Sequence, residues 1–570
     1  MPLTPEQQQC RAQILSEDYL DLIYTVRLTA NEIFSDYGPF CRETINYNYS
    51  IAHLDRRRVP DYSIPAYGYD AIPDLYSLLD TSALEAADIT PLLLSPGPDL
   101  RGQGVLIGFL DTGIDYRNAL FRHTDGSTRI AALWDQTIQS DRPPADFPYG
   151  TEYTEEELNT ALRSADPYEL VPSLDENGHG TFLAGVAAGG ESADGRFSGA
   201  APEATLAVVK CKTAKENLKR YYFNNQSDVY QTTDLMTGLS YLLSTAARLQ
   251  LPLVICFGMG SNGGAHDGTT VLETLLSQLT SQSGIVPVLA AGNEGNRAHH
   301  YYGVLGPEDS MEEVSLRIPE GTAGFRAELW GEPSEIYSVA FLSPSGELFP
   351  RIPARLGQSQ VLTSPLTSTR LFVDYTLTVS VSGNLLISLG FENPTPGLWT
   401  IQVFHDTPSS GFFHIWLPIT APTEPDPVFL RPDPDITLTS PGNARSGLVV
   451  SAWDHRSDSL YVYSSRGYTR DRRVRPDLAA PGVAVEGPAP DGRLIARSGS
   501  SVAAAIAAGA AADLLTWGVT NRNDISLDAQ AVRAYLIRGA GKKDVYSYPN
   551  REWGYGTLDL LGAFETLVHK

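Results

Sequence analysis

Short apolar runs alternate with amphipathic stretches between residues 104 and 303, and this alternation predicts the core of the fold. The apolar runs are GVLIGFLDTG, ATLAVVKCK, LPLVICFGMG and GIVPVLAAGNEG. Between them lie helix-length segments: TEEELNTALRSA, TTDLMTGLSYLLSTAARL and TVLETLLSQLTS. Because strands that are apolar throughout are typical of a parallel sheet covered on both faces, the pattern predicts an α/β, doubly wound, mainly parallel sheet. Such sheets place their sites at the carboxyl ends of strands.

The pattern changes after Gly303, where many short apolar runs are separated by Pro, Gly and Ser turns. Tyr375, Leu377, Val379 and Val381 alternate with polar residues, which is the period of a half-buried strand. This region predicts an inserted β-sandwich. Its role is either to bind a partner or to rigidify the core, and its apolar runs favour rigidity. The α/β texture returns at SGLVVSAWD. Near the N-terminus, two helices are expected, in EDYLDLIYTVRLTANEIF and LYSLLDTSALEAADI, on either side of an irregular stretch.

The net charge and the cysteine content limit the partners and the compartment that we expect for the protein. The formal charge of −25 argues against nucleic acid or an anionic membrane surface as a partner, since both need clustered Lys and Arg. Neither a secretory signal nor an apolar run of membrane-spanning length is apparent, so we expect synthesis in the cytoplasm and no membrane insertion. Cys10, Cys41, Cys211 and Cys256 lack metal-ligand spacing. Cys211 and Cys256 lie in apolar runs, where buried free thiols are expected, and this usage suits a reducing compartment.

Polar residues stand at the ends of the predicted strands. Asp111 ends the first apolar run, His179 lies between two glycines, and Asn293 follows the last run. Ser501 begins a helix rich in alanine, RSGSSVAAAIAAGAAADLL. Taken singly, each has a structural explanation: a turn or cap for the Asp, Asn and Ser, and a buried structural histidine.

The four residues together match the requirements of nucleophilic acyl transfer. That chemistry needs a hydroxyl, an imidazole to take its proton, a carboxylate to orient the ring, and a donor for the developing oxyanion. The chain order Asp, His, Ser is one of the known orders for this geometry.

The stretches DTGID, GHGT, AAGNEG and SGSSVAAA resemble the motifs of the subtilisin-like (subtilase) serine proteases. The resemblance implies that Asp111 orients the ring, that His179 is the general base and that Ser501 is the nucleophile. It also implies an oxyanion hole formed by Asn293 and the backbone N–H of Ser501, with Ser500 as a supporting residue or cap. The implied substrate-binding strand is Phe257, Gly258, Met259 and Gly260.

A finer resemblance, to the Csp germination proteases of clostridial spores and their gut Firmicutes relatives, covers LWDQT, YGTEYTEEELN, YQTTDLMTGLSYL and GSNGGAHDGT. It implies an N-terminal α/β prodomain and a jelly-roll insertion. The expected division is prodomain 1–67, subtilase domain 68–304 and 435–570, and jelly-roll domain 305–434. Self-cleavage is expected at Tyr67–Gly68, after which the prodomain stays bound in the cleft.

The resemblance implies a serine endopeptidase that acts on a protein or peptide substrate, and specifically on the zymogen of a spore cortex hydrolase. Packaging in the spore is implied too. Two alternatives stay open: a pseudoprotease that only binds partners, and a general intracellular subtilase. No cofactor is expected. Many subtilases bind calcium, but no dense run of Asp and Asn ligands indicates it here. His299 and His300 are interpreted as part of an exposed loop rather than a metal site.

Overall fold

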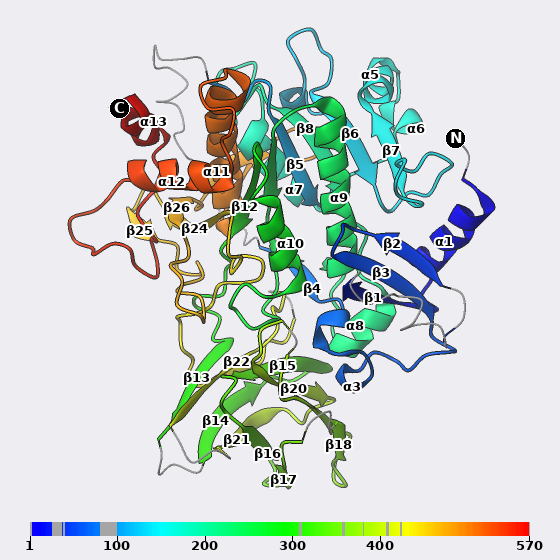
Figure 1. The fold of residues 1–570 in the computed structure, drawn as a ribbon, viewed down its shortest axis with the longest axis vertical. Coiled ribbons are helices and arrows are strands. Elements are labelled where there is room, and N and C mark those ends of the chain that lie inside the picture. Colours follow the sequence, from blue (N-terminus) through cyan, green and yellow to red (C-terminus); the bar gives the residue numbers. More distant parts are fainter. Residues whose placement is uncertain are drawn as a thin grey trace.

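The computed structural model describes residues 3–25, 37, 40–79, 100–306, 311–355, 359–379, 381–405, 410–421 and 424–568. Three parts are visible in Figure 1: an α/β unit, an N-terminal unit beside it, and a β-sandwich that forms the lower lobe. The N-terminal unit ends at Leu79. The α/β unit comprises the described residues from Leu100 to Ala298 and from Leu430 onward.

The α/β unit is built on a mixed, mainly parallel sheet, in the order β25-β24-β12-β10-β5-β8-β6-β7, with β26 beside β24. The parallel strands are β5 (Leu106–Asp111), β6 (Ile130–Asp135), β8 (Thr205–Lys210), β10 (Leu253–Phe257), β12 (Ile285–Ala290), β24 (Leu448–Asp454) and β26 (Leu478–Pro481). The antiparallel edge strands are β7 (Thr151–Thr154) and β25 (Ser459–Leu460). The predicted fold class is confirmed.

Helices cover both faces of this sheet because each buried strand is apolar on both sides. Ile107 and Phe109 join one core with α7 (His179–Ala188) and α11 (Ser500–Leu515). Leu106 and Leu110 join the other core. Its helices are α9 (Thr232–Leu249) and α10 (Val271–Leu279), in front of the sheet in Figure 1. The remaining helices are α5 (Glu155–Arg163), α6 (Pro167–Leu170), α8 (Glu216–Tyr222), α12 (Ala529–Gly539) and α13 (Leu560–Val568).

The alanine-rich helix runs through the middle of the core. Ser500–Thr520 is the one helical stretch among the described residues that is long and apolar enough to cross a membrane, yet 89% of its apolar window is buried inside the protein. This burial is that of a core helix. Its alanines leave no bulk, so α7 and the sheet approach it closely.

The N-terminal unit folds as a three-stranded antiparallel sheet in the order β1-β3-β2, with a helix packed against it. Its elements are α1 (Pro5–Leu15), β1 (Tyr19–Thr25), β2 (Cys41–Thr44), β3 (Tyr49–Asp55) and α3 (Ile64–Tyr67). The helix expected over residues 17–34 is wrong in its first part, because residues 19–25 form a strand; residues 26–34 lie outside the described part of the chain. Leu20 and Leu22 are buried in one cluster and Ile23 in another, so the strand is buried on both faces and has no period of two.

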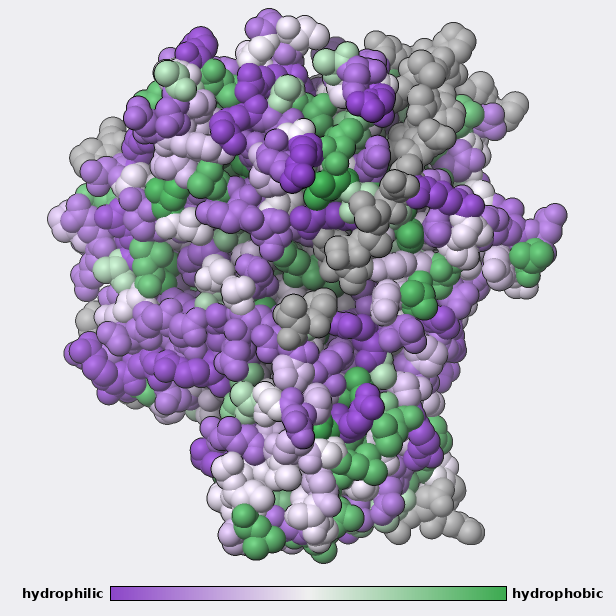
Figure 2. All heavy atoms as spheres, turned by 180° about the vertical axis from the view of Figure 1, so that it is seen from behind, coloured by the Kyte–Doolittle hydropathy of each residue, from purple (hydrophilic) through white to green (hydrophobic). Residues whose placement is uncertain are grey.

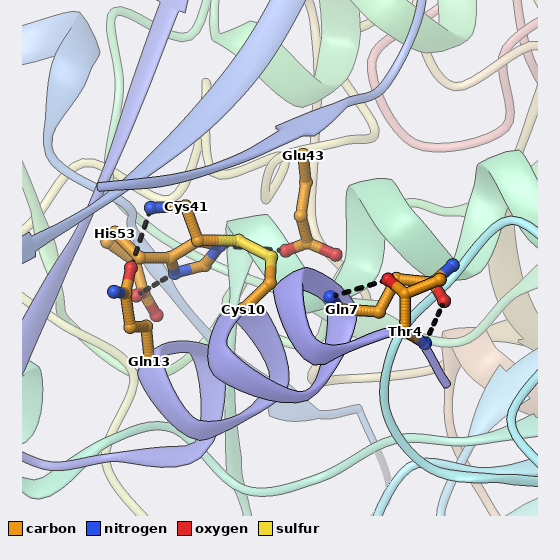
Figure 3. The surroundings of a disulfide bond; sticks show 8 residues. Thr4, Gln7, Cys10, Gln13, Cys41, Glu43 and His53 are labelled. Carbon is orange, nitrogen blue, oxygen red and sulfur yellow. Dashed lines mark hydrogen bonds and ion pairs between the residues drawn. A yellow bond between two sulfur atoms is a disulfide. The ribbon is translucent and has the colours of Figure 1, made fainter. Parts of the chain in front are cut away.

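A disulfide between Cys10 and Cys41 joins α1 to β2 (Figure 3). Gln13 reinforces the same contact, since its side-chain oxygen accepts the Cys41 N–H at 2.6 Å. The sequence interpretation found no pairing among the cysteines, because the partners lie in different elements and only the fold brings them together. Cys211 and Cys256 are free and buried, as predicted.

The insertion is a sandwich of two antiparallel sheets, which confirms the prediction of a β-sandwich. One sheet has the order β13-β22-β15-β20-β19-β18 and the other β17-β16-β21-β14-β23. The first sheet consists of β13 (His300–Leu305), β15 (Gly324–Gly331), β18 (Ser359–Thr363), β19 (Arg370–Thr376), β20 (Leu385–Glu392) and β22 (Gly411–Trp416). The second consists of β14 (Met311–Ile318), β16 (Tyr337–Leu342), β17 (Leu348–Ile352), β21 (Gly397–His405) and β23 (Val428–Phe429).

His299 and His300 lie where the chain enters the sandwich, and the interpretation of an exposed loop is wrong. Both are buried, with exposed fractions of 2% and 1%. The His299 ring bridges Glu294 at 2.5 Å and Asp426 at 2.7 Å, whereas Nε2 of His300 lies 2.9 Å from Nδ1 of His414. The two rings therefore have separate partners, and both keep hydrogen bonds although they are buried.

The face of the molecule drawn in Figure 2 is mostly hydrophilic where it is coloured. Figure 2 shows hydrophobic side chains scattered among polar ones over the back of the molecule, including the lower lobe. The side chains that carry the chemistry lie instead inside the fold.

Candidate active site

Asp111, His179 and Ser501 meet at the carboxyl edge of the central sheet. Asp111 is the last residue of β5, His179 the first of α7, and Ser501 the second of α11. Nδ1 of His179 lies 2.7 Å from Oδ1 of Asp111, and Nε2 lies 3.4 Å from Oγ of Ser501. All three are at most 1% exposed. The structure thus brings together the three residues that the sequence singled out for acyl transfer.

Asp175 holds the histidine in place. Its carboxylate accepts the backbone N–H groups of Gly178 and Thr181, both at 2.8 Å, and the Thr112 hydroxyl at 2.7 Å. It thereby fixes the first turn of α7 and ties that turn to the end of β5. Asp175 is not among the residues predicted from the sequence. Its position shortly before a glycine at a helix start is the signal that could have found it.

Ser500 supports the site without capping its helix, since the N-cap position belongs to Gly499. The Ser500 hydroxyl accepts the Gly292 N–H at 3.0 Å, and the Ser500 N–H donates to Oδ1 of Asn293 at 2.9 Å. The start of α11 and the end of β12 are therefore fastened together. Because Oδ1 of Asn293 is held by the Ser500 N–H, the amide nitrogen Nδ2 points into the cleft.

Leu79 occupies the site. Its carbonyl oxygen accepts hydrogen bonds from Nδ2 of Asn293 at 2.8 Å and from the Ser501 hydroxyl at 2.7 Å. Its N–H donates to the Gly258 carbonyl at 3.3 Å. A peptide carbonyl thus rests on a hydroxyl and on a side-chain amide donor, which is where an oxyanion would develop.

The chain leading to Leu79 lies in the cleft as an added strand. β4 (Leu75–Leu78) pairs antiparallel with β11 (Met259–Gly260) on one side and with β9 (Val229–Gln231) on the other. Strand addition is a common way to bind an extended peptide, because main-chain bonds hold it while alternate side chains enter pockets. The N-terminal unit therefore delivers its own final strand as the bound peptide.

This placement corrects two expectations. Leu75–Leu78 is a strand, whereas LYSLLDTSALEAADI was expected to be helical; residues 80–89 of that stretch lie outside the described part of the chain. The expected cleavage bond, Tyr67–Gly68, is not at the serine either. Tyr67 ends the short helix α3 and its hydroxyl donates to the Pro60 carbonyl. A helical turn cannot add to the cleft as a strand.

Glycines make room for the bound strand and the chemistry. A Cβ on Gly258 would lie 3.2 Å from Cβ of Ser501 and 3.3 Å from Cε1 of His179. A Cβ on Gly260 would lie 3.0 Å from Cδ1 of Leu79 and 2.5 Å from Oγ1 of Thr439. Of the predicted substrate strand, Gly258, Met259 and Gly260 contact or pair with the bound peptide, and Phe257 packs against Tyr76.

A cavity of about 250 Å³ runs beside the bound strand. Leu78, Leu79, Asn177, Asn293 and Arg497 are among its lining residues. Among the residues that the structure describes, no three His, Cys, Asp or Glu side chains gather in a way that could hold a metal ion.

Comparison with known proteins places this geometry in a family. The profile described as "Subtilase family" matches residues 102–317 and 432–556, and the gap between these ranges corresponds to most of the sandwich. The solved structure of the CspB protease of Clostridium perfringens is similar, with a TM-score of 0.75 and 29% identity; the match covers 84% of this chain and 96% of that one.

Two curated proteases are more distant. The subtilisin-like protease PopC of Myxococcus xanthus is 25% identical over 43% of this chain and 46% of its own. The serine protease AprX of Bacillus subtilis is 27% identical over 39% of this chain and 40% of its own. The chain thus spans less than half the length of these two relatives. The profile match, the CspB-like fold and the meeting of Asp111, His179 and Ser501 lead to one conclusion: the chain belongs to the subtilase family.

Proposed function

We propose that the chain is a serine endopeptidase in which Ser501 is the nucleophile, His179 the general base and Asp111 the orienting acid. The observation that carries the proposal is the Leu79 carbonyl, held by the Ser501 hydroxyl and the Asn293 amide. Ser501 stands in the positive field of the α11 N-terminus, which favours negative charge on a bound oxygen. The pseudoprotease alternative has no such support, since every group that the reaction needs is present.

The reaction follows from these positions. Oγ of Ser501 attacks the carbonyl carbon of Leu79 and gives its proton to Nε2 of His179, once the 3.4 Å separation shortens. The carbonyl oxygen becomes an oxyanion, stabilised by Nδ2 of Asn293 and the Ser501 N–H. Asp111 holds the imidazolium by its 2.7 Å bond to Nδ1. His179 then returns the proton to the leaving amine, and water hydrolyses the acyl-enzyme by the same steps.

The first substrate is the chain itself. We expect cleavage of the bond after Leu79, since that carbonyl occupies the site. The N-terminal unit then stays in the cleft, because β4 keeps its main-chain bonds to β9 and β11 whether or not the bond is intact. The unit acts as an inhibitor until it is released or degraded.

A processing assay tests this proposal. Wild type should separate into two fragments on a denaturing gel, whereas Ser501→Ala should remain a single chain of the same fold. Asp111→Asn should process several orders of magnitude more slowly than wild type, because the ring takes the wrong tautomer. Processing of Ser501→Ala at the wild-type rate would contradict the proposal.

The resemblance to the Csp proteases also supports a proposal about the protein substrate. We propose that the enzyme, packaged in the spore, activates the zymogen of a spore cortex hydrolase by limited proteolysis. The similarity of the fold to the CspB protease supports this assignment. Incubation of the processed enzyme with such a zymogen should give one cut and a gain of hydrolase activity. A zymogen that stays intact, under conditions where a peptide is cleaved, would contradict it.

A further inference from the structure

The side chain of Tyr76 fills a pocket three residues before Leu79 along the bound strand. It is 1% exposed, and its ring meets Phe257 edge to face with centroids 6.3 Å apart. Val271, Leu438 and Ala444 belong to the same buried cluster. Because alternate residues of a strand point the same way, Tyr76 and Leu78 share a face of β4, where Tyr76 is buried and Leu78 is half-buried.

The Tyr76 hydroxyl meets polar side chains in this pocket, the hydroxyls of Ser440 and Thr270. The Tyr76 oxygen lies 3.0 Å from Oγ of Ser440, which in turn lies 3.2 Å from Oγ1 of Thr270. Thr270 caps α10, and its hydroxyl oxygen accepts the Glu273 N–H at 3.3 Å. Either hydroxyl can be the donor in each of the two contacts of Ser440, so Ser440 can pair with the tyrosine as donor or as acceptor.

Ser440 is fixed rigidly. Its N–H donates to the Ser261 carbonyl at 2.8 Å, and its carbonyl accepts the Ser261 N–H at 3.0 Å. Ser261 directly follows β11, the strand that binds the substrate main chain. Ser440 is itself 1% exposed, so a hydroxyl that loses its partner there has little water to replace it.

We propose that this pocket selects tyrosine by its hydroxyl, with Ser440 as the specificity-determining residue and Thr270 as its support. The inference rests on the proposed endopeptidase function and names its substrate class. Substrates carry an exposed extended segment with tyrosine three residues before the scissile leucine, as in Tyr76-Ser77-Leu78-Leu79. Phenylalanine fills the same space but leaves the buried Ser440 with one fewer partner, and sites built around a hydroxyl discriminate against analogues that lack it.

A double-mutant cycle on self-processing tests the pairing. Wild type, Tyr76→Phe, Ser440→Ala and the double variant are produced by cell-free translation, and the rate of cleavage after Leu79 is measured for each. Loss of one buried hydrogen bond should slow Tyr76→Phe about tenfold. In the Ser440→Ala background the same change should have less than about a twofold effect. Ser261→Ala is the matched control: its hydroxyl contacts Asp74 rather than the pocket, so the tenfold effect should persist.

A second measurement needs no variant enzyme. Processed wild type is given two peptides that contain Xaa-Ser-Leu-Leu-Asp, with Xaa as tyrosine or phenylalanine. We expect kcat/KM about tenfold higher for the tyrosine peptide. Equal values, or a Tyr76→Phe effect that survives in Ser440→Ala, would overturn the inference and leave the endopeptidase function standing. Absence of any cut after Leu79 in wild type would instead overturn the proposed function.

Discussion

Replacing Lys215 by methionine should loosen the hold of the α/β unit on the N-terminal unit. Lys215 precedes α8, and its ammonium nitrogen lies 2.7 Å from Oδ1 of Asp21 on β1. Both side chains are at most 4% exposed. Asp21 also contacts His53 at 2.6 Å and accepts a bond from Gln231 at 2.7 Å. Burial alone would raise the pKa of Asp21, but Lys215 and His53 bring it well below its usual range, so the carboxylate is charged.

The size of the effect follows from the geometry. Removing one partner of a buried ion pair costs about 3–5 kcal/mol, because the other charge is left uncompensated. Asp21 keeps His53, whose other nitrogen contacts Glu43 at 2.9 Å (Figure 3), so we expect the lower end of that range. At about 1.4 kcal/mol per factor of ten, 3 kcal/mol weakens the association roughly a hundredfold.

Peptide hydrolysis after dilution reports this association. The bound N-terminal unit blocks the cleft, so activity should appear only as that unit dissociates from the processed complex. Lys215→Met should become active at roughly a hundredfold higher protein concentration than wild type. The matched control is Lys219→Met in α8. Lys219 pairs with Glu216, whose side chain is 64% exposed and stays hydrated when the lysine is lost, so this change should cost little.

Two results would refute the reasoning. One is a Lys215→Met complex that dissociates at the same concentration as wild type. The other is a Lys219→Met complex that dissociates as readily as Lys215→Met, since this would show that any lost lysine weakens the interface. Circular dichroism of each purified complex establishes that both variants are folded before dilution.

Further predictions concern the cleft and the sandwich. Asn293→Ala should lower kcat about 100- to 1,000-fold with little change in KM, because one oxyanion donor is lost; an unchanged kcat would contradict its role. Gly260→Ala should reduce cleavage after leucine more than after alanine, measured with paired peptides, since its Cβ meets Leu79. Burial lowers the pKa of His266 to about 3 and of His300 to about 4, so the folded state excludes their protons. The contribution of each ring to stability should therefore fall below pH 6.5, by about 1.4 kcal/mol per pH unit, whereas Asp74 and Glu273, whose pKa burial raises to about 7, act in the opposite direction. Urea unfolding of wild type and His266→Gln at pH 5 and 7 isolates one ring, because the variant should lose less stability at pH 5 than wild type does.

The parallel strands β5, β8, β10 and β12 were predictable because they are apolar and end at glycine or polar residues. Asp111, Asn293 and His179 stand at strand ends or helix starts, and parallel strands bring such positions to one edge. The alanine run predicted a helix with Ser501 in its first turn. Local pattern was enough for these elements, since each is decided by residues that are neighbours in the sequence.

The bound strand was not predictable in the same way. Leu75–Leu78 has no strand period of its own, and its conformation is imposed by β9 and β11, which are distant in the sequence. The same holds for β1, which is buried on both faces by residues that are distant in the sequence. The Tyr67–Gly68 bond was chosen for its aromatic residue and flexible glycine, and neither property places a segment at the serine.

The contacts that support the site could not be predicted from the sequence either. Asp175 acts through backbone N–H groups. The only feature of its own segment that indicates this role is its distance to Gly178. The Cys10–Cys41 disulfide depends on how α1 packs on β2. His299 is buried between two carboxylates from separate segments, and a pair of adjacent histidines gives no sign of such partners.

Identification of the N-terminus created by self-processing tests the central claim most directly. Edman sequencing and intact mass of the larger wild-type fragment should give Asp80-Thr81-Ser82 as its start, because the carbonyl before that bond lies between the Ser501 hydroxyl and the Asn293 amide. A fragment that begins at Gly68, or a wild-type chain that stays whole while it hydrolyses peptides, would contradict the account.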